Sequence, residues 1–348
     1  MSGIFDTETI EQFRRHISTA RNIVLMAHSN PDGDAIGSML ALRDILVRVL
    51  NKPTEAVHCL LPNRCPRTMM FLPGAESLQD AETDLENCLR QVAESDLIIC
   101  LDLNKAERVG PLQEALRHST AHKLLLDHHR DPDETLFDAI ISQPTISSTC
   151  ELLYWVSLQT WGDVLDTATA TCLYTGMCTD TGSFSYSCEQ PSLYEAAAAL
   201  LQHPIGAAEI HNRLFNTYSV ERMNFLGFCL SQRLRIFPDH HLAYFYLSHA
   251  DQRQYHVQPE ELEGIVNYTL MMETIEVGAL VKEGSDGCVR ISLRSKYDFD
   301  VNQFAMQLYG GGGHRKAAGA TSSDDFNTTV SRLEQNLLAA LSTKPAER

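Results

Sequence analysis

The stretch Asn22-Ile-Val-Leu-Met-Ala-His28-Ser-Asn-Pro-Asp32-Gly-Asp34-Ala-Ile-Gly37-Ser38 decides how this chain folds. Its apolar part, residues 23–27, is short and β-branched at its start, which is typical of a strand that is covered on both faces. The turn-forming segment 30–33 ends the strand, and apolar residues at helical spacing predict a helix over 34–50. Ligands of an open α/β sheet bind beyond the carboxyl ends of its strands. The candidate site residues in this stretch are therefore His28, Asp32 and Asp34.

Asp and Asn in a strand-to-helix turn also serve as helix caps, and each of these residues taken alone favours that structural role. The same pattern recurs, however, because the apolar run 97–101 is followed by Asp102 and the apolar run 124–126 is followed by Asp127, His128 and His129. A further aspartate, Asp180, stands just before a glycine turn. Since the carboxyl ends of parallel strands line one edge of a sheet, these side chains are expected to converge on one crevice.

Carboxylates mixed with neutral imidazoles suit a divalent transition ion such as Mn²⁺. The converging set has more aspartates and histidines than one ion needs, and two ions that share a bridging carboxylate fit that number. Such a pair clamps the attacking and leaving oxygens of a phosphoryl displacement. Cations are also needed for charge balance, because neighbouring carboxylates repel one another.

The composition is that of an ordinary globular protein of 348 residues, with 44% hydrophobic and 21% charged residues. A net charge of −17 argues against a long nucleic-acid duplex as a partner, because phosphate contacts need a basic surface. Ten cysteines without a C-x-x-C pair indicate reduced, mostly buried thiols. Neither a signal peptide nor a membrane span is evident, and we expect a cytoplasmic protein.

Strand-like and helix-like segments alternate in the N-terminal part, which predicts an α/β fold with a doubly wound parallel sheet. Strands are expected at 23–27, 56–61, 96–102 and 123–127, and helices at 5–19, 34–50, 83–93, 111–118, 149–160 and 167–180. We expect a catalytic domain over 1–190, a helical connector over 191–227, and a smaller α/β domain over 228–348. In the last domain, strands are expected at 241–247, 277–281 and 288–294, with a helix capped by Asp300.

Near the C-terminus the sequence reads Gly310-Gly-Gly-Gly313-His314-Arg315-Lys-Ala-Ala-Gly319. A glycine run by itself is more often a flexible turn than a binding site. Without side chains, however, a loop can bring backbone N–H groups close to a phosphate, and His314 and Arg315 add directed donors. We therefore interpret this segment as a phosphate-binding loop.

These motifs resemble those of the DHH phosphoesterase superfamily. The segment 28–38, the strand-end Asp102, Asp127-His128-His129, and Asp180 within Cys-Thr-Asp-Thr-Gly-Ser-Phe occur in the order of that superfamily. The glycine-rich segment 310–319 resembles the signature of the DHH-associated C-terminal domain. The resemblance spans about residues 20–325, and the two-domain length is similar to the NrnA type, the oligoribonuclease/pAp phosphatases. Family members often have a basic residue in the fourth motif, where this chain has Ser185, which bears on contacts to a second nucleotide.

The resemblance implies two Mn²⁺ ions, with Mg²⁺ or Co²⁺ as substitutes. His28 and Asp32 would hold one ion, and Asp102 would bridge both. The other ion would be held by Asp34, His128 and Asp180.

The resemblance also implies roles in catalysis and substrate binding. Asp102, Asp127 and His129 would be the catalytic residues, with Asp127 orienting an imidazole and His129 contacting the scissile phosphate and supplying a proton to the leaving oxygen. Substrate would be bound by Arg108, Gly312, Gly313, His314 and Arg315.

By this resemblance the protein is expected to hydrolyse short single-stranded oligoribonucleotides (nanoRNA) to mononucleotides and to dephosphorylate adenosine 3′,5′-bisphosphate (pAp). The active site would lie in the cleft between the two domains, and the resemblance allows a homodimer. One alternative is a phosphodiesterase for cyclic dinucleotides or linear dinucleotides, such as c-di-AMP and pApA. A non-catalytic nucleotide sensor and an inorganic pyrophosphatase rank lower, since no expected metal ligand is missing and pyrophosphatases of this superfamily lack the Gly-rich His-Arg signature.

Overall fold

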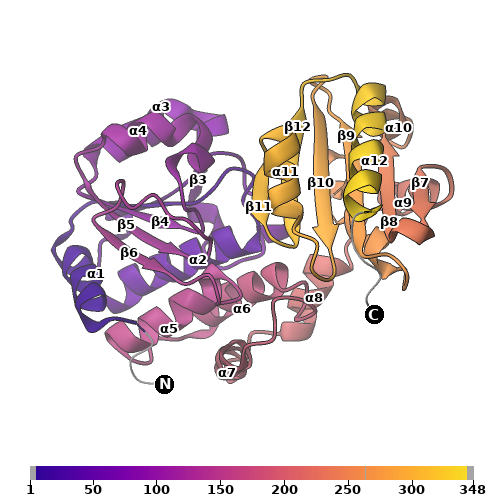
Figure 1. Ribbon diagram of the computed structural model, residues 1–348. Coiled ribbons are helices and arrows are strands. Elements are labelled where there is room, and N and C mark those ends of the chain that lie inside the picture. The colour runs from indigo at the N-terminus through magenta and orange to yellow at the C-terminus, as the bar shows by residue number, and fades with distance from the viewer. Residues whose placement is uncertain (1–4, 263, 343–348) are drawn as a thin grey trace. The chain divides into compact units, whose positions relative to one another are not determined.

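The computed structural model describes residues 5–262 and 264–342. The chain divides into two compact units, Met1–Thr217 and Tyr218–Arg348, and each unit is built on its own six-stranded sheet (Figure 1). None of the helices in the described part of the chain combines the length and the apolar character that crossing a bilayer requires.

The sheet of the first unit is entirely parallel and has the strand order β3-β2-β1-β4-β5-β6. From β1 the chain adds strands first on one side and then on the other, so the order reverses between β1 and β4. This is the doubly wound topology that the alternating segments predicted, and ligands of such sheets bind at the reversal point. The strands are β1 Ile23–Met26, β2 Val57–Leu61, β3 Leu78–Asp80, β4 Leu97–Leu101, β5 His122–Asp127 and β6 Ala139–Ser142.

Helices cover both faces of this sheet (Figure 1). Strand β1 shows why both are needed: Ile23 and Leu25 pack into one hydrophobic core, and Val24 and Met26 into the other. The first core is closed by α1 Thr7–Thr19, α2 Gly33–Asp44, α5 Thr149–Trp161, α6 Thr167–Asp180 and α7 Pro191–Leu200. The second core is closed by α3 Ala81–Glu94 and α4 Gln113–His118.

The predicted elements of this unit are confirmed to within a few residues, with three differences. The predicted helix 34–50 changes after Asp44 into the π-helix Ile45–Val49, and the helix predicted over 111–118 begins as a 3₁₀-helix, Ala106–Leu112, before α4. Strands β3 and β6 were not predicted. Both are short edge strands: the side chains of β3 are half-buried, and those of β6 alternate between buried and half-buried, so neither shows the long, fully buried apolar run that marked the central strands.

The second unit is an α/β domain with the strand order β11-β12-β10-β9-β8-β7. Only β8 and β9 pair in parallel, and all other neighbours are antiparallel. The strands are β7 Leu234–Phe237, β8 Leu242–Leu247, β9 Val277–Glu283, β10 Val289–Ser295, β11 Gly312–His314 and β12 Ala317–Ser322. The helices are α9 Val220–Gln232, α10 His249–Gln254, α11 Val301–Tyr309 and α12 Phe326–Ser342. Asp300 caps α11, as the sequence predicted.

The prediction of an open glycine loop is wrong. Gly310 ends α11 in the left-handed conformation, and Gly312–His314 form β11, which pairs with β12. A Cβ atom at Gly311 or Gly313 would come within 2.2 or 2.5 Å of a carbonyl oxygen of β12, so close backbone packing requires glycine at both positions. Most of the run is therefore explained by the geometry of the hairpin.

The segment 191–227 contributes to both units. Helix α7 and α8 Ala207–Phe215 pack into the core of the first unit through side chains such as Leu193 and Ile210. Helix α9 packs into the second unit through Phe225 and Cys229. The assignment of 191–227 as a connector stays a prediction.

Helices α2 and α6 pack closely because each has a glycine at the contact. A Cβ atom at Gly37 would lie 2.5 Å from the carbonyl oxygen of Cys172. A Cβ atom at Gly176 would lie 2.2 Å from Cys150 Sγ and 2.9 Å from Asp34 Oδ1. This packing brings the start of α2, with Asp34, against the end of α6, with Asp180.

Gly176→Ala is expected to destabilise the protein by about 1–3 kcal/mol, because the added methyl group has no room between α6, Cys150 and Asp34. Gly227→Ala, on the exposed face of α9 where no atom lies within 4 Å of the added Cβ, is expected to stabilise by about 0.5–1 kcal/mol. Urea denaturation of both variants measures the difference. Equal stability of the two variants would contradict the close packing of α2 on α6.

Candidate metal centre

The candidate metal ligands collect beyond the carboxyl ends of β1, β4 and β5, at the reversal point of the sheet. His28 and Asp102 follow β1 and β4, while Asp127 ends β5 and is followed by His128 and His129. The remaining ligands come from helix ends, because Asp32 caps α2, Asp34 lies in its first turn and Asp180 is the last residue of α6.

Within the first unit, three sets of side chains have potential ligand atoms within 4.8 Å of one another. The structure brings together all six residues that the sequence predicted as metal ligands, and their division between two ions stays a prediction. The sets are His28 with Asp32 and Asp102, Asp34 with His128 and Asp180, and Asp102 with Asp127 and His129.

Asp102 lies at the middle of the cluster, and its two carboxylate oxygens face different sets. Oδ2 is 3.2 Å from His28 Nε2, whereas Oδ1 is 3.5 Å from His128 Nε2. The residue is buried and has a left-handed backbone with φ 57°, a conformation that few non-glycine residues adopt. Its backbone N–H donates to Leu126 O at 3.1 Å, and Thr149 Oγ1 donates to Oδ1 at 3.2 Å. The orientation of the carboxylate is thus fixed by both backbone and side-chain bonds.

The two histidines that face Asp102 are oriented alike. Nδ1 of His28 lies 2.9 Å from Ser29 O, and Nδ1 of His128 lies 3.4 Å from Ile146 O. These backbone acceptors assign the proton to Nδ1 in each ring and turn Nε2 toward the carboxylates. Nε2 of His128 is 3.2 Å from Asp180 Oδ2, and Nε2 of His28 is 4.0 Å from Asp32 Oδ1. An inward Nε2 with an anchored Nδ1–H is the usual arrangement of a metal-binding histidine.

Asp32 and Asp34 are both held by helix N-termini. Oδ1 of Asp32 accepts from the backbone N–H groups of Asp34 and Ala35 at 3.0 and 3.1 Å, so the capping role weighed from the sequence is real. Asp34 is fully buried and accepts from the backbone N–H groups of Thr149 at 2.6 Å and Cys150 at 2.8 Å, at the start of α5. Capping and metal binding are therefore compatible, because each carboxylate is positioned by the bonds that it accepts.

Thr149 was not predicted as a site residue. Its hydroxyl contacts Asp102 and its backbone N–H contacts Asp34, so it links the two halves of the cluster. The signal in the sequence is the helix start at this point, where the Ser148 hydroxyl accepts from the backbone N–H of Glu151. That signal predicts a cap but gives no indication of what the N-terminus faces.

Asp127 and His129 form a second pair beside Asp102. Nδ1 of His129 lies 2.7 Å from Oδ1 of the fully buried Asp127 and 3.5 Å from Asp102 Oδ1. The imidazole that Asp127 orients is thus that of His129, whose side chain is 16% exposed.

The electrostatics of the cluster call for cations. Burial by itself lowers the pKa of His28, but the hydrogen bond to Asp102 and its charge outweigh burial and raise that pKa to about 9. Burial, together with the charge of Asp102, raises the pKa of Asp34 to about 7. Burial and the charge of Asp34 likewise raise the pKa of Asp180 well above its usual range. Carboxylates and imidazoles crowded in this way fit divalent cations, which would supply the missing positive charge.

Arg108 is half-buried on the 3₁₀-helix Ala106–Leu112, and its backbone oxygen accepts from Ser29 N–H at 2.7 Å. The positive charge of Arg108 lowers the pKa values of His28 and Asp180, although burial and the neighbouring carboxylates affect both pKa values more strongly. The charge of the guanidinium therefore reaches both His28 and Asp180, and its contact with a substrate phosphate stays a prediction.

The other predicted substrate-binding residues lie in the second unit and are exposed to solvent. Gly312, Gly313 and His314 form β11. Arg315 follows this strand, and its Nη2 donates to Asp298 O at 3.3 Å. Their contacts with substrate stay predictions.

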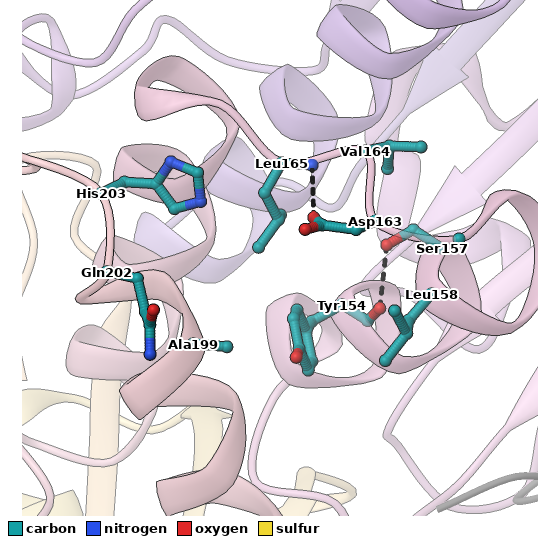
Figure 2. A pocket seen from close by; sticks show the side chains of 10 residues that line it. Tyr154, Ser157, Leu158, Asp163, Val164, Leu165, Ala199, Gln202 and His203 are labelled. Atoms are coloured by element: carbon teal, nitrogen blue, oxygen red, sulfur yellow. Dashed lines mark hydrogen bonds between the residues drawn. The ribbon is translucent and has the colours of Figure 1, made fainter.

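A pocket of about 390 Å³ lies elsewhere in the first unit, along α5 and the connections after α5 and α7 (Figure 2). Its lining includes Tyr154, Asp163 and His203, and none of the predicted site residues. Two of its polar groups are bound within the chain, since Asp163 accepts from Leu165 N–H and Ser157 donates to Tyr154 O. The convergent titratable groups lie at the metal centre and not in this pocket.

Comparison with known proteins identifies two domains. The N-terminal domain of the DHH family matches residues 22–177, and the DHHA1 domain matches residues 240–343. The chain is 28% identical over 328 residues to the bifunctional oligoribonuclease and PAP phosphatase NrnA of Bacillus subtilis (strain 168), covering 92% of this chain and 96% of the relative. It is 25% identical over 334 residues to the cyclic-di-AMP phosphodiesterase GdpP of Geobacillus thermodenitrificans (strain NG80-2), covering 94% of this chain and 48% of the relative.

A similar solved structure is the crystal structure of an exopolyphosphatase-related protein from Bacteroides fragilis. It superposes with a TM-score of 0.92 at 29% identity and covers 98% of this chain and 100% of that chain. The motifs at 28–38, Asp102 and Asp127–His129 lie within the first domain match, and the glycine-rich segment 310–319 lies within the second.

The pKa values of the metal-free cluster predict how its stability depends on pH. The pKa of His28 is raised from 6.5 to about 9, so its contribution to stability is complete below pH 6.5 and is lost as pH rises through about 9. Asp34 acts in the same direction between pH 3.8 and about 7. We expect the free energy of unfolding of EDTA-treated protein to fall by on the order of 3 kcal/mol between pH 6.5 and 9.

Urea denaturation across this pH range, with His28→Gln and the exposed His118→Gln as a matched pair, checks this expectation. His28→Gln is expected to flatten the fall and His118→Gln to leave it in place. With Mn²⁺ present the slope is expected to reverse, because metal binding needs both groups deprotonated. An unchanged slope in the His28→Gln protein would contradict the role of the His28–Asp102 pair.

Proposed function

We propose that this chain, which carries the DHH and DHHA1 domains, is a two-metal phosphoesterase that hydrolyses short oligoribonucleotides to mononucleotides and dephosphorylates pAp. The observation that carries this proposal is the position of Asp102, whose two oxygens face two different sets of histidine and aspartate ligands. The similarity to an oligoribonuclease and PAP phosphatase over 92% of the chain supports the choice of substrates.

Of the possible metals, we propose Mn²⁺, with Mg²⁺ or Co²⁺ as substitutes, because the ligand set mixes carboxylates with imidazoles. His28 and Asp32 would hold one ion and Asp102 would bridge to the second. The second ion would be completed by Asp34, His128 and Asp180. When bound, such a pair polarises the phosphate and offsets the charge that develops on the attacking and leaving oxygens.

His129 is proposed as the residue that supplies a proton to the leaving oxygen. Its Nδ1–H donates to the buried Asp127 carboxylate, which fixes the ring, so Nε2 is the atom left to transfer the proton. Asp127 therefore acts through His129, as a positioning residue.

We propose that Arg108 in the first unit, and residues in and next to β11 in the second unit, bind phosphate groups of the substrate. The two glycines of β11 differ in the space around them. A Cβ atom at Gly312 would meet nothing closer than Asn302 Oδ1 at 4.0 Å. Internal packing therefore does not require glycine at this position, unlike Gly313. We infer that Gly312 keeps the strand open for a substrate phosphate, with His314 and Arg315 as donors.

A second candidate function is hydrolysis of c-di-AMP or pApA, favoured by the 25% identity to a cyclic-di-AMP phosphodiesterase. This chain spans 48% of that relative's length, and the metal centre would serve both activities. We rank it second because the oligoribonuclease matches along nearly its whole length.

We infer that the protein works in the cytoplasm, since all ten cysteines are free thiols, which suits a reducing compartment. Its high negative charge suits short substrates that are held by metal ions, and not a long duplex. The possible homodimer stays a prediction.

The proposal is tested by turnover with Mn²⁺ on five substrates: pAp, pApA, c-di-AMP, a short RNA and pyrophosphate. Wild-type protein is expected to release mononucleotides from the RNA and phosphate from pAp. Asp102→Asn keeps the side-chain volume but removes the bridging charge, and is expected to lower both activities by about 1,000-fold or more. Asp239→Asn, on the surface of the second unit, is the matched control and should keep full activity. If c-di-AMP is turned over in preference to the others, the protein is a cyclic-dinucleotide phosphodiesterase with the same metal centre. If the metal-loaded protein turns over none of the five substrates, the proposal that it is a phosphoesterase is refuted.

Arg108→Gln is expected to raise KM for pAp about tenfold or more, because the variant loses charge-assisted hydrogen bonds to a substrate phosphate. The backbone bond between Arg108 and Ser29 remains, so the fold should be kept. Arg117→Gln is the matched control, since Arg117 pairs with Glu107 at the surface. Steady-state kinetics of both variants measure the effect, and an equal KM in the two would exclude Arg108 from the substrate site.

A further inference from the structure

The turn that directly follows Asp180, a candidate metal ligand, carries an exposed aromatic side chain. The backbone N–H groups of Ser185 and Tyr186 both donate to Thr181 O, at 2.8 and 3.1 Å. Thr181 is the residue directly after Asp180, whose carboxylate lies 3.2 Å from His128 Nε2. The chain thus folds back so that the backbone of Tyr186 bonds to the residue directly after Asp180, while the side chain of Tyr186 is 50% exposed.

The ring of Tyr186 packs against Gly182. A Cβ atom at Gly182 would lie 2.2 to 2.6 Å from Cε1, Cζ and the hydroxyl oxygen of Tyr186. Any larger residue would therefore displace the ring from the backbone of the turn. The hydroxyl end of the ring lies against the backbone of the turn, and half of the side chain remains accessible to solvent.

The turn is rigid although its backbone is unfavourable. Gly182, Ser183 and Phe184 are left-handed in succession, with φ values of 50°, 60° and 61°. Phe184 N–H donates to Thr181 Oγ1 at 2.9 Å, and Ser183 Oγ lies 3.0 Å from Nδ1 of His211 on α8. A conformation of this kind persists only where surrounding bonds determine it, and such conformations gather at functional sites.

The neighbouring aromatic residue has a different role. Phe184 is only partly exposed and packs against Tyr174 and Tyr194, with ring centroids 5.9 and 6.1 Å apart. It anchors the turn to α6 and α7. The turn thus holds one aromatic residue inward and leaves another, Tyr186, exposed.

The segment 182–187, Gly-Ser-Phe-Ser-Tyr-Ser, carries no charge. It offers no ion pair to a second phosphate, whereas the exposed ring of Tyr186 offers an aromatic surface on which an uncharged ring can stack. Nucleobases stack on aromatic side chains with little dependence on sequence. A phosphate ester without a base would gain nothing from this ring.

We propose that the ring of Tyr186 stacks on a nucleobase of the substrate and thereby makes the site select nucleotides over other phosphate esters. The inference rests on the proposed function, because it takes the phosphate beside the base to be held at the metal centre. His211 acts as a positioning residue, since it holds Ser183 and so the turn that carries the ring.

The test compares binding of AMP with binding of ribose 5-phosphate, which has the same phosphate and sugar but no base. Titration calorimetry on the full chain loaded with Mn²⁺ measures both affinities. Wild-type protein is expected to bind AMP about tenfold or more tightly than ribose 5-phosphate. Tyr186→Leu, which keeps apolar volume but has no aromatic face, is expected to lose most of this preference, whereas Tyr186→Trp retains it.

Tyr218→Leu is the matched control, because Tyr218 is a 44% exposed tyrosine of the second unit and takes no part in the turn or in its packing. It should keep the preference for AMP, and thermal melting of each variant checks the fold. The inference is overturned if wild-type protein binds both ligands equally, or if Tyr186→Leu weakens both ligands to the same extent. If none of the five substrates is hydrolysed but the preference for AMP still depends on Tyr186, the stacking inference stands and the proposed activity falls.

Discussion

The first unit depends on one electrostatic constraint, which is the close approach of several carboxylates at one edge of a parallel sheet. Asp34, Asp102 and Asp127 are buried, and the imidazoles around them cannot neutralise them all. The raised pKa values of Asp34 and His28 follow from this crowding of negative charge. Without metal, both groups keep protons at pH values at which they are ordinarily deprotonated. Divalent cations resolve it, and the same ions are what phosphoryl transfer needs.

The fold meets this constraint by aiming backbone dipoles and N–H groups at the carboxylates. Asp32 is held by the N-terminus of α2 and Asp34 by that of α5, where peptide dipoles favour negative charge. The close packing of α2 on α6, which the glycines at 37 and 176 permit, sets the distance between Asp34 and Asp180. The bonds that position these carboxylates are therefore compatible with the proposed metal binding by the same side chains.

The central features could be predicted from sequence because each has a local signal. The run 23–27 is apolar throughout, and the polar residues after three such runs predict a shared edge once the sheet is parallel. Thr149 could not be predicted in this way, because its contact with Asp102 joins segments far apart in the chain. Strands β3 and β6 were missed since short, half-buried edge strands leave a weak pattern. The glycine run was read as a loop because sequence alone does not reveal the backbone of β12, which accounts for Gly311 and Gly313.

The central claim is that Asp102 joins two metal sites. Electron paramagnetic resonance during titration of the metal-free protein with Mn²⁺ tests it most directly, because two ions that share a carboxylate are exchange-coupled. We predict a spectrum of coupled ions at two equivalents of Mn²⁺, and its replacement by the hyperfine pattern of isolated ions in Asp102→Asn. Isolated ions at every stoichiometry in the wild-type protein, or coupling that survives in Asp102→Asn, would contradict the account.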